Sequence, residues 1–235
     1  MAGPPLSSPQ WRSGGSQRIP RPDGWGYGGS APWADRVRPL TTKDVVAALA
    51  RRRHVEPLAP AGRLRESAVL VLLTDGADGA EVLVTRRSQV VTNHRGEISF
   101  PGGRVDAGET FEVAALREAH EEVALDPGVV ELHGRLDPIS TPVSSSFIVP
   151  VIATVETHPS LTAAADEVDR ILWVPLAELT RVDTFREEMW KRDGDTRPIF
   201  FFELDDETIW GATARVLHQL LRVALGIEGP EPPAI

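Results

Sequence analysis

The chain has 235 residues, of which 41% are hydrophobic and 25% charged, and its formal net charge is −9. This length fits one domain with appendages. The acidic balance argues against a general nucleic-acid-binding protein, because neutralising phosphates requires a basic surface. A nucleotide substrate stays open, since a cation and a few arginines can reverse the field in one cleft. With no cysteine, disulfides and thiol chemistry are excluded.

Nothing in the sequence indicates a membrane protein. The longest apolar run, residues 68–73, has the length of a strand. The first residues lack the apolar segment of a signal peptide. We therefore expect a cytoplasmic enzyme with no membrane or nucleic-acid partner.

Both ends of the chain differ in composition from the middle. Residues 1–39 are rich in Gly, Pro, Ser and Arg, with Trp11, Trp25 and Trp33 isolated among them. Such a segment has little periodic apolar content to offset its ordering entropy, so we predict a disordered arm. The alternative is a docking arm anchored by the tryptophans. Residues 40–226 form the predicted domain, and residues 227–235 a Pro-rich tail.

The first predicted elements are a helix and a hairpin. Thr41 opens a helix that ends at the basic residues 51–53, where cations suit the helix dipole. Residues 67–73 and 81–85 read as two strands around the turn 75–79. Arginines then cluster before the next element. Arg86, Arg87 and Arg95 are fork-shaped donors suited to phosphate oxygens, and the alternative for each is an ordinary surface arginine.

A glycine loop at residues 100–108 runs into an acidic helix. The helix begins at Thr110, a predicted N-cap, and continues without Pro or Gly to Val123. Helical spacing places Glu118, Glu121 and Glu122 on one face. The opposite stripe is apolar and is predicted to pack on a sheet; it comprises Phe111, Val113, Leu116, Ala119 and Val123.

Three carboxylates on one face repel one another, and the helix dipole at this end is also negative. A divalent cation removes that penalty. Hard oxygen ligands without cysteine or a histidine pair favour Mg²⁺ or Mn²⁺ over Zn²⁺. The alternative is a solvated acidic helix face.

The rest of the chain alternates strands and loops before a last helix. Strands are predicted at residues 129–136, 147–155, 166–176, 183–190 and 198–204, and an amphipathic helix follows Trp210. Glu167 lies at the start of the third of these strands. In the aromatic run 200–202 we expect core packing plus one exposed or ligand-facing ring. These elements indicate an α+β fold, an α/β/α sandwich with a mixed β-sheet.

The spacing of Gly103, Glu109, Arg117-Glu118 and Glu121-Glu122 resembles the signature of the Nudix hydrolases. These enzymes cleave nucleoside diphosphates linked to another moiety. The likeness covers roughly residues 65–225. Ala124 stands where the family usually has glycine, and we expect this exchange to be mild provided that the backbone there is not left-handed.

An upstream motif resembles the coenzyme A pyrophosphatase branch. Its matching residues are Leu83-Val84-Thr85-Arg86-Arg87-Ser88, Gly96 and Phe100-Pro101-Gly102-Gly103, at the branch's intervals. Thr92 occupies the position of the branch's middle arginine, and Arg95 is its candidate replacement. The resemblance implies substrate contacts from Arg86, Arg87, Ser88 and Arg95.

The resemblance implies a Nudix-type sandwich and Mg²⁺- or Mn²⁺-dependent hydrolysis of coenzyme A or acyl-CoA to 3′,5′-ADP and 4′-phosphopantetheine. The predicted metal ligands are Glu118, Glu121, Glu122 and the Gly103 carbonyl. Arg117 orients the carboxylates, Glu109 braces the loop, and Glu121 is the first choice of base, with Glu118 and Glu167 as rivals.

Two other functions are weighed. One is hydrolysis of ADP-ribose or another nucleoside-diphosphate compound, favoured if Thr92 marks loss of the coenzyme A site. The other is a non-catalytic Nudix module that binds a regulatory nucleotide, against which the intact acidic pairs count. A homodimer is compatible with the sequence.

Overall fold

The structure, a computed structural model, describes residues 11–52, 64–88, 95–141, 146–192 and 194–227. Its helices are α1 (Thr42–Arg51), α2 (Phe111–Val123), α3 (Leu176–Leu179) and α4 (Gly211–Ala224), with a 3₁₀ turn at Pro127–Val129. The strands are β1 (Gly26–Tyr27), β2 (Arg65–Gly76), β3 (Gly79–Arg87), β4 (Ile98–Ser99), β5 (Gly102–Arg104), β6 (Glu131–Arg135), β7 (Ile139–Thr141), β8 (Ser146–Thr154), β9 (Val168–Pro175), β10 (Phe185–Arg192), β11 (Asp195–Glu203) and β12 (Thr208–Trp210).

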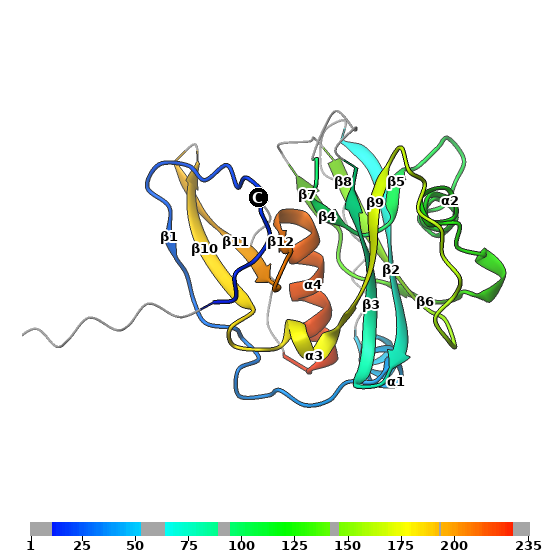
Figure 1. The fold of residues 1–235 in the computed structure, drawn as a ribbon, viewed down its shortest axis with the longest axis horizontal. Coiled ribbons are helices and arrows are strands. Elements are labelled where there is room, and N and C mark those ends of the chain that lie inside the picture. Colours follow the sequence, from blue (N-terminus) through cyan, green and yellow to red (C-terminus); the bar gives the residue numbers. More distant parts are fainter. Residues whose placement is uncertain (1–10, 53–63, 89–94, 142–145, 193, 228–235) are drawn as a thin grey trace, which may run out of the picture.

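A mixed sheet forms the centre of the fold. Its main path is β4-β3-β2-β8-β6, with β5 paired to β2, β7 to β8 and β9 to β3. Strands β2 and β8 are parallel, and the other pairs are antiparallel. Helix α2 covers one face, while α1 and α4 lie on the other (Figure 1). This confirms the α+β sandwich with a mixed β-sheet.

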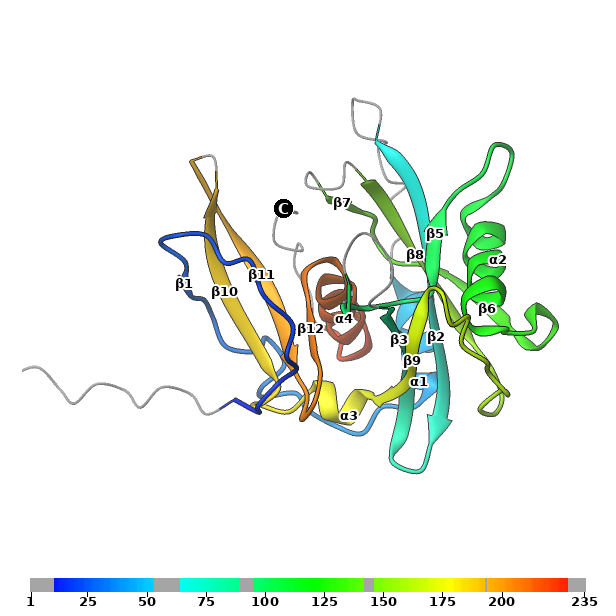
Figure 2. The ribbon, with the colours of Figure 1, turned by 45° about the horizontal axis from the view of Figure 1, so that its top comes forward.

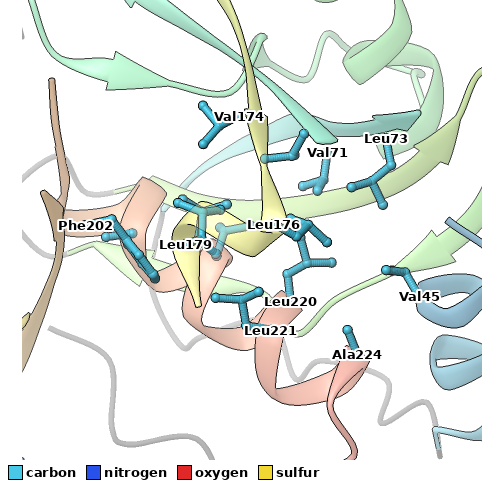
Figure 3. Packing of buried hydrophobic residues seen from close by; sticks show 14 of the residues in the cluster. Val45, Val71, Leu73, Val174, Leu176, Leu179, Phe202, Leu220, Leu221 and Ala224 are labelled. Carbon is cyan, nitrogen blue, oxygen red and sulfur yellow. The ribbon is translucent and has the colours of Figure 1, made fainter. Parts of the chain in front are cut away.

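The unbroken apolar run in β2 follows from burial of both faces of the sheet. Ala68, Leu70 and Leu72 belong to the cluster under α2, whereas Val71 and Leu73 belong to the cluster that includes α4. Alternate strand residues point to opposite faces, so a strand covered on both sides needs apolar residues throughout. Figure 3 shows the α4 side, where Val71 and Leu73 lie near Leu220 and Leu176.

A second sheet packs on the far side of α4. Its order is β1-β10-β11-β12, and all its pairs are antiparallel. Figure 2 shows the resulting layers: this sheet, then α4, then the mixed sheet, then α2. Strands β10 and β11 were predicted, but β1, β12 and the assembly of the four into a separate sheet were not.

The prediction of a disordered arm is wrong for residues 11–39. Trp33 is fully buried, and β1 pairs with β10. Trp11 donates from Nε1 to the Phe185 carbonyl at 3.1 Å. The blue segment in Figure 1 runs along the second sheet. Isolated tryptophans bury large apolar areas without any periodicity, which is why a periodicity argument overlooks them.

The aromatic run of β11 is also buried more completely than predicted. Phe200, Phe201 and Phe202 are all at most 1% exposed, so no ring of the three faces solvent. Phe202 stacks with Trp33, and Phe201 stacks with Trp210. The reason is that Trp33 of the N-terminal segment and Trp210 at the end of β12 pack on the rings of β11.

The predicted first helix and first hairpin are confirmed, whereas the loop predicted at residues 139–146 begins with strand β7. Helix α1 carries a capping box between Thr41 and Asp44, and β2 and β3 form the expected hairpin. Among the described residues, no helix is long and apolar enough to cross a membrane. Most of the predicted tail, residues 228–235, lies outside the described residues.

Candidate metal and active site

Helix α2 presents the predicted acids because a local cap sets its start and its alanines pack on the sheet. The Thr110 hydroxyl accepts a hydrogen bond from the Val113 N–H at 3.3 Å, which begins the helix. Ala114, Ala115, Ala119 and Val123 are buried against the sheet. The predicted stripe is therefore right for Ala119 and Val123, whereas Val113 is 51% exposed. Alanines supply the close-packing face instead.

The helix ends in a left-handed residue. Ala124 has φ 54° and ψ 30°, and its N–H donates to the carbonyls of Ala119 and His120. Among the described residues it is the only non-glycine residue with positive φ. The expectation that alanine is mild here is wrong, because this backbone region is strained for a residue that carries a Cβ atom.

Arg117 joins the loop to the acids. Its Nη1 lies 3.0 Å from both Glu118 Oε1 and Glu121 Oε2. Its Nε lies 2.9 Å from Glu109 Oε1, and its Nη2 donates to the Arg104 carbonyl at 2.9 Å. The hydrogen bond from Arg117 is the main reason that the pKa of Glu109 lies below its usual range. One guanidinium thus fixes carboxylates from the loop and from the helix.

Glu122 is the most unusual acid of the set. Its side chain is buried, and Oε2 has no hydrogen-bond partner among the described residues. Burial raises the pKa of Glu122 to about 8, Arg87 opposes that rise, and Glu118 and Glu167 reinforce it. A buried carboxylate oxygen without a donor is costly, so it marks a place where a cation or ligand would be stabilised.

Glu118 lies directly against the glycine loop. A Cβ on Gly103 would come within 2.4 Å of the Glu118 carboxylate, so any residue larger than glycine would displace that carboxylate. Burial raises the pKa of Glu118, Arg117 opposes this, and Glu121 and Glu167 add to it. The charge of Glu167 thus raises the pKa of two acids of the helix, Glu118 and Glu122.

The structure places the four predicted substrate-binding residues in different surroundings. Leu83 of β3 packs in the cluster under α2, so strand alternation puts Arg87 on that same side, and its charge lowers the pKa of Glu122. Arg86 is paired instead with Glu207, 2.8 Å away, a buried acid that the sequence analysis overlooked. Ser88 is buried, and its N–H donates to the Glu167 carbonyl. Arg95 is exposed in the turn before β4, and Thr92 lies outside the described residues.

Nothing local could have singled out Glu207. It follows Asp205 and Asp206 in a turn, and such an acidic run is normally solvated. Its burial comes from arginines that β3 and β9 bring to it.

A family model for the NUDIX domain matches residues 64–195, which is more than half of the chain. The chain belongs to the Nudix family. It is thus a Nudix pyrophosphohydrolase, an enzyme that acts on nucleoside-diphosphate-linked substrates.

Curated relatives carry the same family name. A Klebsiella pneumoniae protein named uncharacterized Nudix hydrolase NudL is 33% identical over 166 residues, 70% of this chain and 85% of the relative. The Escherichia coli K12 protein of that name is 32% identical over 157 residues, 66% of this chain and 81% of the relative. A solved Nudix hydrolase from M. smegmatis, RenU, is 18% identical, with a TM-score of 0.48 over 71% of this chain and 89% of that one.

Nudix hydrolases generally use divalent metal cations, and the acids of α2 fit one chemically. Within the described residues, no three acidic or histidine side chains are close enough to enclose an ion. The donors are nevertheless hard carboxylate oxygens, and the Glu122 Oε2 atom lacks a hydrogen-bond partner in the described part of the chain. Arg117 holds the exposed Glu121 carboxylate, so the acids are tied to a protein cation in this arrangement.

Proposed function

We propose that this Nudix hydrolase cleaves the diphosphate of coenzyme A or an acyl-CoA, releasing 3′,5′-ADP and the 4′-phosphopantetheine product. The observation that carries the proposal is the position of Arg87. Strand alternation puts this residue of the upstream motif on the α2 side of β3, the side of Leu83, and its charge lowers the pKa of Glu122. Both observations support a single site built from the motif typical of coenzyme A pyrophosphatases and the Nudix signature.

The proposed metal ligands are the carboxylates of Glu118, Glu121 and Glu122, with the Gly103 carbonyl as a fourth oxygen. The cation is Mg²⁺ or Mn²⁺, because all donors are oxygen atoms. When bound, it neutralises the diphosphate and lowers the pKa of water.

The remaining residues of the site activate the attacking water and orient the metal-binding carboxylates. Glu121, 57% exposed at its side chain, accepts the proton of the attacking water. Arg117 positions Glu118 and Glu121, and Glu109 braces the loop through Arg117. Glu118 and Glu167 are the rival bases, the latter because its charge acts on Glu118 and Glu122.

On the substrate side, Arg87 and Arg95 donate to phosphate oxygens. Arg86 contributes from its pair with Glu207, and Ser88 holds Glu167 near the site through its backbone N–H. The second candidate substrate is ADP-ribose or a related nucleoside-diphosphate compound. It is favoured by Thr92, which replaces the branch's arginine.

A product assay decides between the two. Purified protein and Mg²⁺ are incubated separately with coenzyme A, ADP-ribose, NADH and diadenosine polyphosphates, and products are identified by mass. We expect 3′,5′-ADP from coenzyme A as the fastest reaction. Faster release of AMP from ADP-ribose, with coenzyme A left intact, would establish the second candidate instead.

A further inference from the structure

Glu207 is a buried carboxylate at which distant parts of the chain meet. It is 2% exposed and lies in the turn between β11 and β12. Its Oε1 lies 2.8 Å from Arg86 Nη1 and 3.1 Å from Arg170 Nη1. Arg86 and Arg170 are directly opposite each other on β3 and β9. The carboxylate therefore ties the second sheet to two strands of the mixed sheet.

The N-terminal segment adds a neutral side chain to this cluster. Gln17 donates from Nε2 to Glu207 Oε2 at 3.2 Å and to the Gly96 carbonyl at 3.3 Å. Its Oε1 accepts from the Thr208 N–H at 3.4 Å. Both ends of the amide are thus engaged, and one of its partners belongs to the loop that precedes β4.

Two glycines let the segment approach so closely. Gly14 has φ +66°, and its N–H donates to the Leu204 carbonyl at 2.8 Å. The Gly15 N–H donates to the Thr208 hydroxyl at 2.9 Å. A Cβ on Gly15 would lie 2.9 Å from the Thr208 nitrogen, so a larger residue would push Gln17 away from Gly96.

From Gly96 the connection continues to the acidic site through the backbone. The Gly96 N–H donates to the Arg87 carbonyl at 3.1 Å, and the Arg87 N–H donates to the Glu97 carbonyl at 2.9 Å. By strand alternation the Arg87 side chain lies on the α2 side of β3, as Leu83 does. Hydrogen bonds thus lead from Gln17, through Gly96, to the backbone of Arg87.

We propose that Gln17 is a positioning residue for Nudix hydrolysis: by bridging Glu207 and the Gly96 carbonyl, it holds Arg87 in place for the diphosphate. The proposal rests on the role given to Arg87 above, but not on coenzyme A as the substrate. Both Gln17 and Glu207 lie outside the residues matched by the family model, so this support belongs to the appended parts of this chain.

The sharpest test is Gln17→Glu in the full chain. This change keeps the size of the side chain and the acceptor for Thr208, while it replaces the Nε2 donor with an oxygen that repels Glu207. Gln17→Ala removes the side chain without introducing that repulsion, and it is the alternative test if Gln17→Glu does not fold. Ser16→Ala, at an exposed neighbour, is the matched control.

Two measurements are made on each variant. Amide hydrogen exchange at Gly96 and Arg87 reports the loop directly and needs no substrate. We expect exchange at both amides to rise about fivefold in Gln17→Ala, the effect of one ordinary hydrogen bond, and further in Gln17→Glu. Exchange at Leu72, in the centre of the mixed sheet, stays unchanged, as do all rates in Ser16→Ala.

Steady-state kinetics on the substrate cleaved fastest give the second measurement. We expect KM to rise about fivefold with kcat within twofold of the parent, because a phosphate-binding group is loosened. Unchanged exchange at Gly96 and Arg87, or a fall in kcat at constant KM, would overturn the proposal. If coenzyme A is not cleaved, the substrate assignment fails, but the hydrogen-exchange result still tests the positioning role of Gln17.

Discussion

Arg117 binds both carboxylate oxygens of Glu109, with Nε 2.9 Å from Oε1 and Nη2 3.1 Å from Oε2. The two residues are eight positions apart, one in the glycine loop and one in the middle of α2. A two-point contact of this kind fixes direction as well as distance, so the loop that carries Gly103 cannot rotate relative to the helix.

Arg117→Lys should therefore separate charge from geometry. Lysine keeps the positive charge but cannot make paired contacts to Glu109 while also holding Glu118 and Glu121. We expect kcat/KM to fall about 10- to 100-fold, as for other groups that orient metal ligands. Steady-state kinetics with saturating Mg²⁺ measure this. Arg104→Lys, an exchange at an exposed position of the same loop, is the control and should be near parental.

Glu122→Gln should leave the fold intact and remove most turnover. Glutamine has the same shape but no charge to offer a cation, so we expect kcat/KM to fall about 100-fold or more. The circular dichroism spectrum should be that of the parent. Glu131→Gln, at an exposed carboxylate of β6, is the matched control. A parental rate for Glu122→Gln in excess Mg²⁺ would remove Glu122 from the site.

The pH dependence of stability should carry the signature of Glu122. Its pKa is about 8 in the folded protein and near 4.5 in the unfolded chain. Between these values the folded state binds more protons, so this group lowers the free energy of unfolding as pH rises. Each pH unit in that window corresponds to about 1.4 kcal/mol at most.

Urea unfolding at pH 5 and pH 8, in buffer treated with a chelator, measures that effect. The parent should lose more stability than Glu122→Gln between the two pH values, because glutamine has no proton to lose. Adding Mg²⁺ at pH 8 should recover the difference in the parent only, since the cation favours the ionised carboxylate. Parallel unfolding curves for the two proteins would contradict the raised pKa.

Ala124→Gly should stabilise the protein. The left-handed backbone at the end of α2 is unfavourable for alanine and costs glycine nothing sterically, so we expect a gain of about 1 kcal/mol. For a chain of this length, that corresponds to a rise in Tm of roughly 2–4 °C. Ala165→Gly, in a turn whose φ is not positive, should lower Tm slightly and shows the ordinary cost of glycine. Equal shifts in both variants would exclude relief of strain.

Helices, hairpins and the spacing of the acids could be predicted because each depends on neighbours in the sequence. Thr110 caps α2 through a residue three positions away, and the acids share a face because of helical pitch alone. The packing stripe was less predictable. Val113 fits the apolar pattern but is exposed, because the sheet approaches the alanines of α2 instead.

The sequence by itself determined the family signature, the mixed α+β architecture and the chemistry of the acidic helix, since these rest on short spacings. Only the tertiary structure decided that Glu122 is the buried acid, that Arg86 pairs with Glu207, and that the N-terminal segment packs on a second sheet. Burial and ion pairing depend on segments that are distant in the sequence, such as Arg86 and Glu207, 121 positions apart, and no local pattern records which of them will meet.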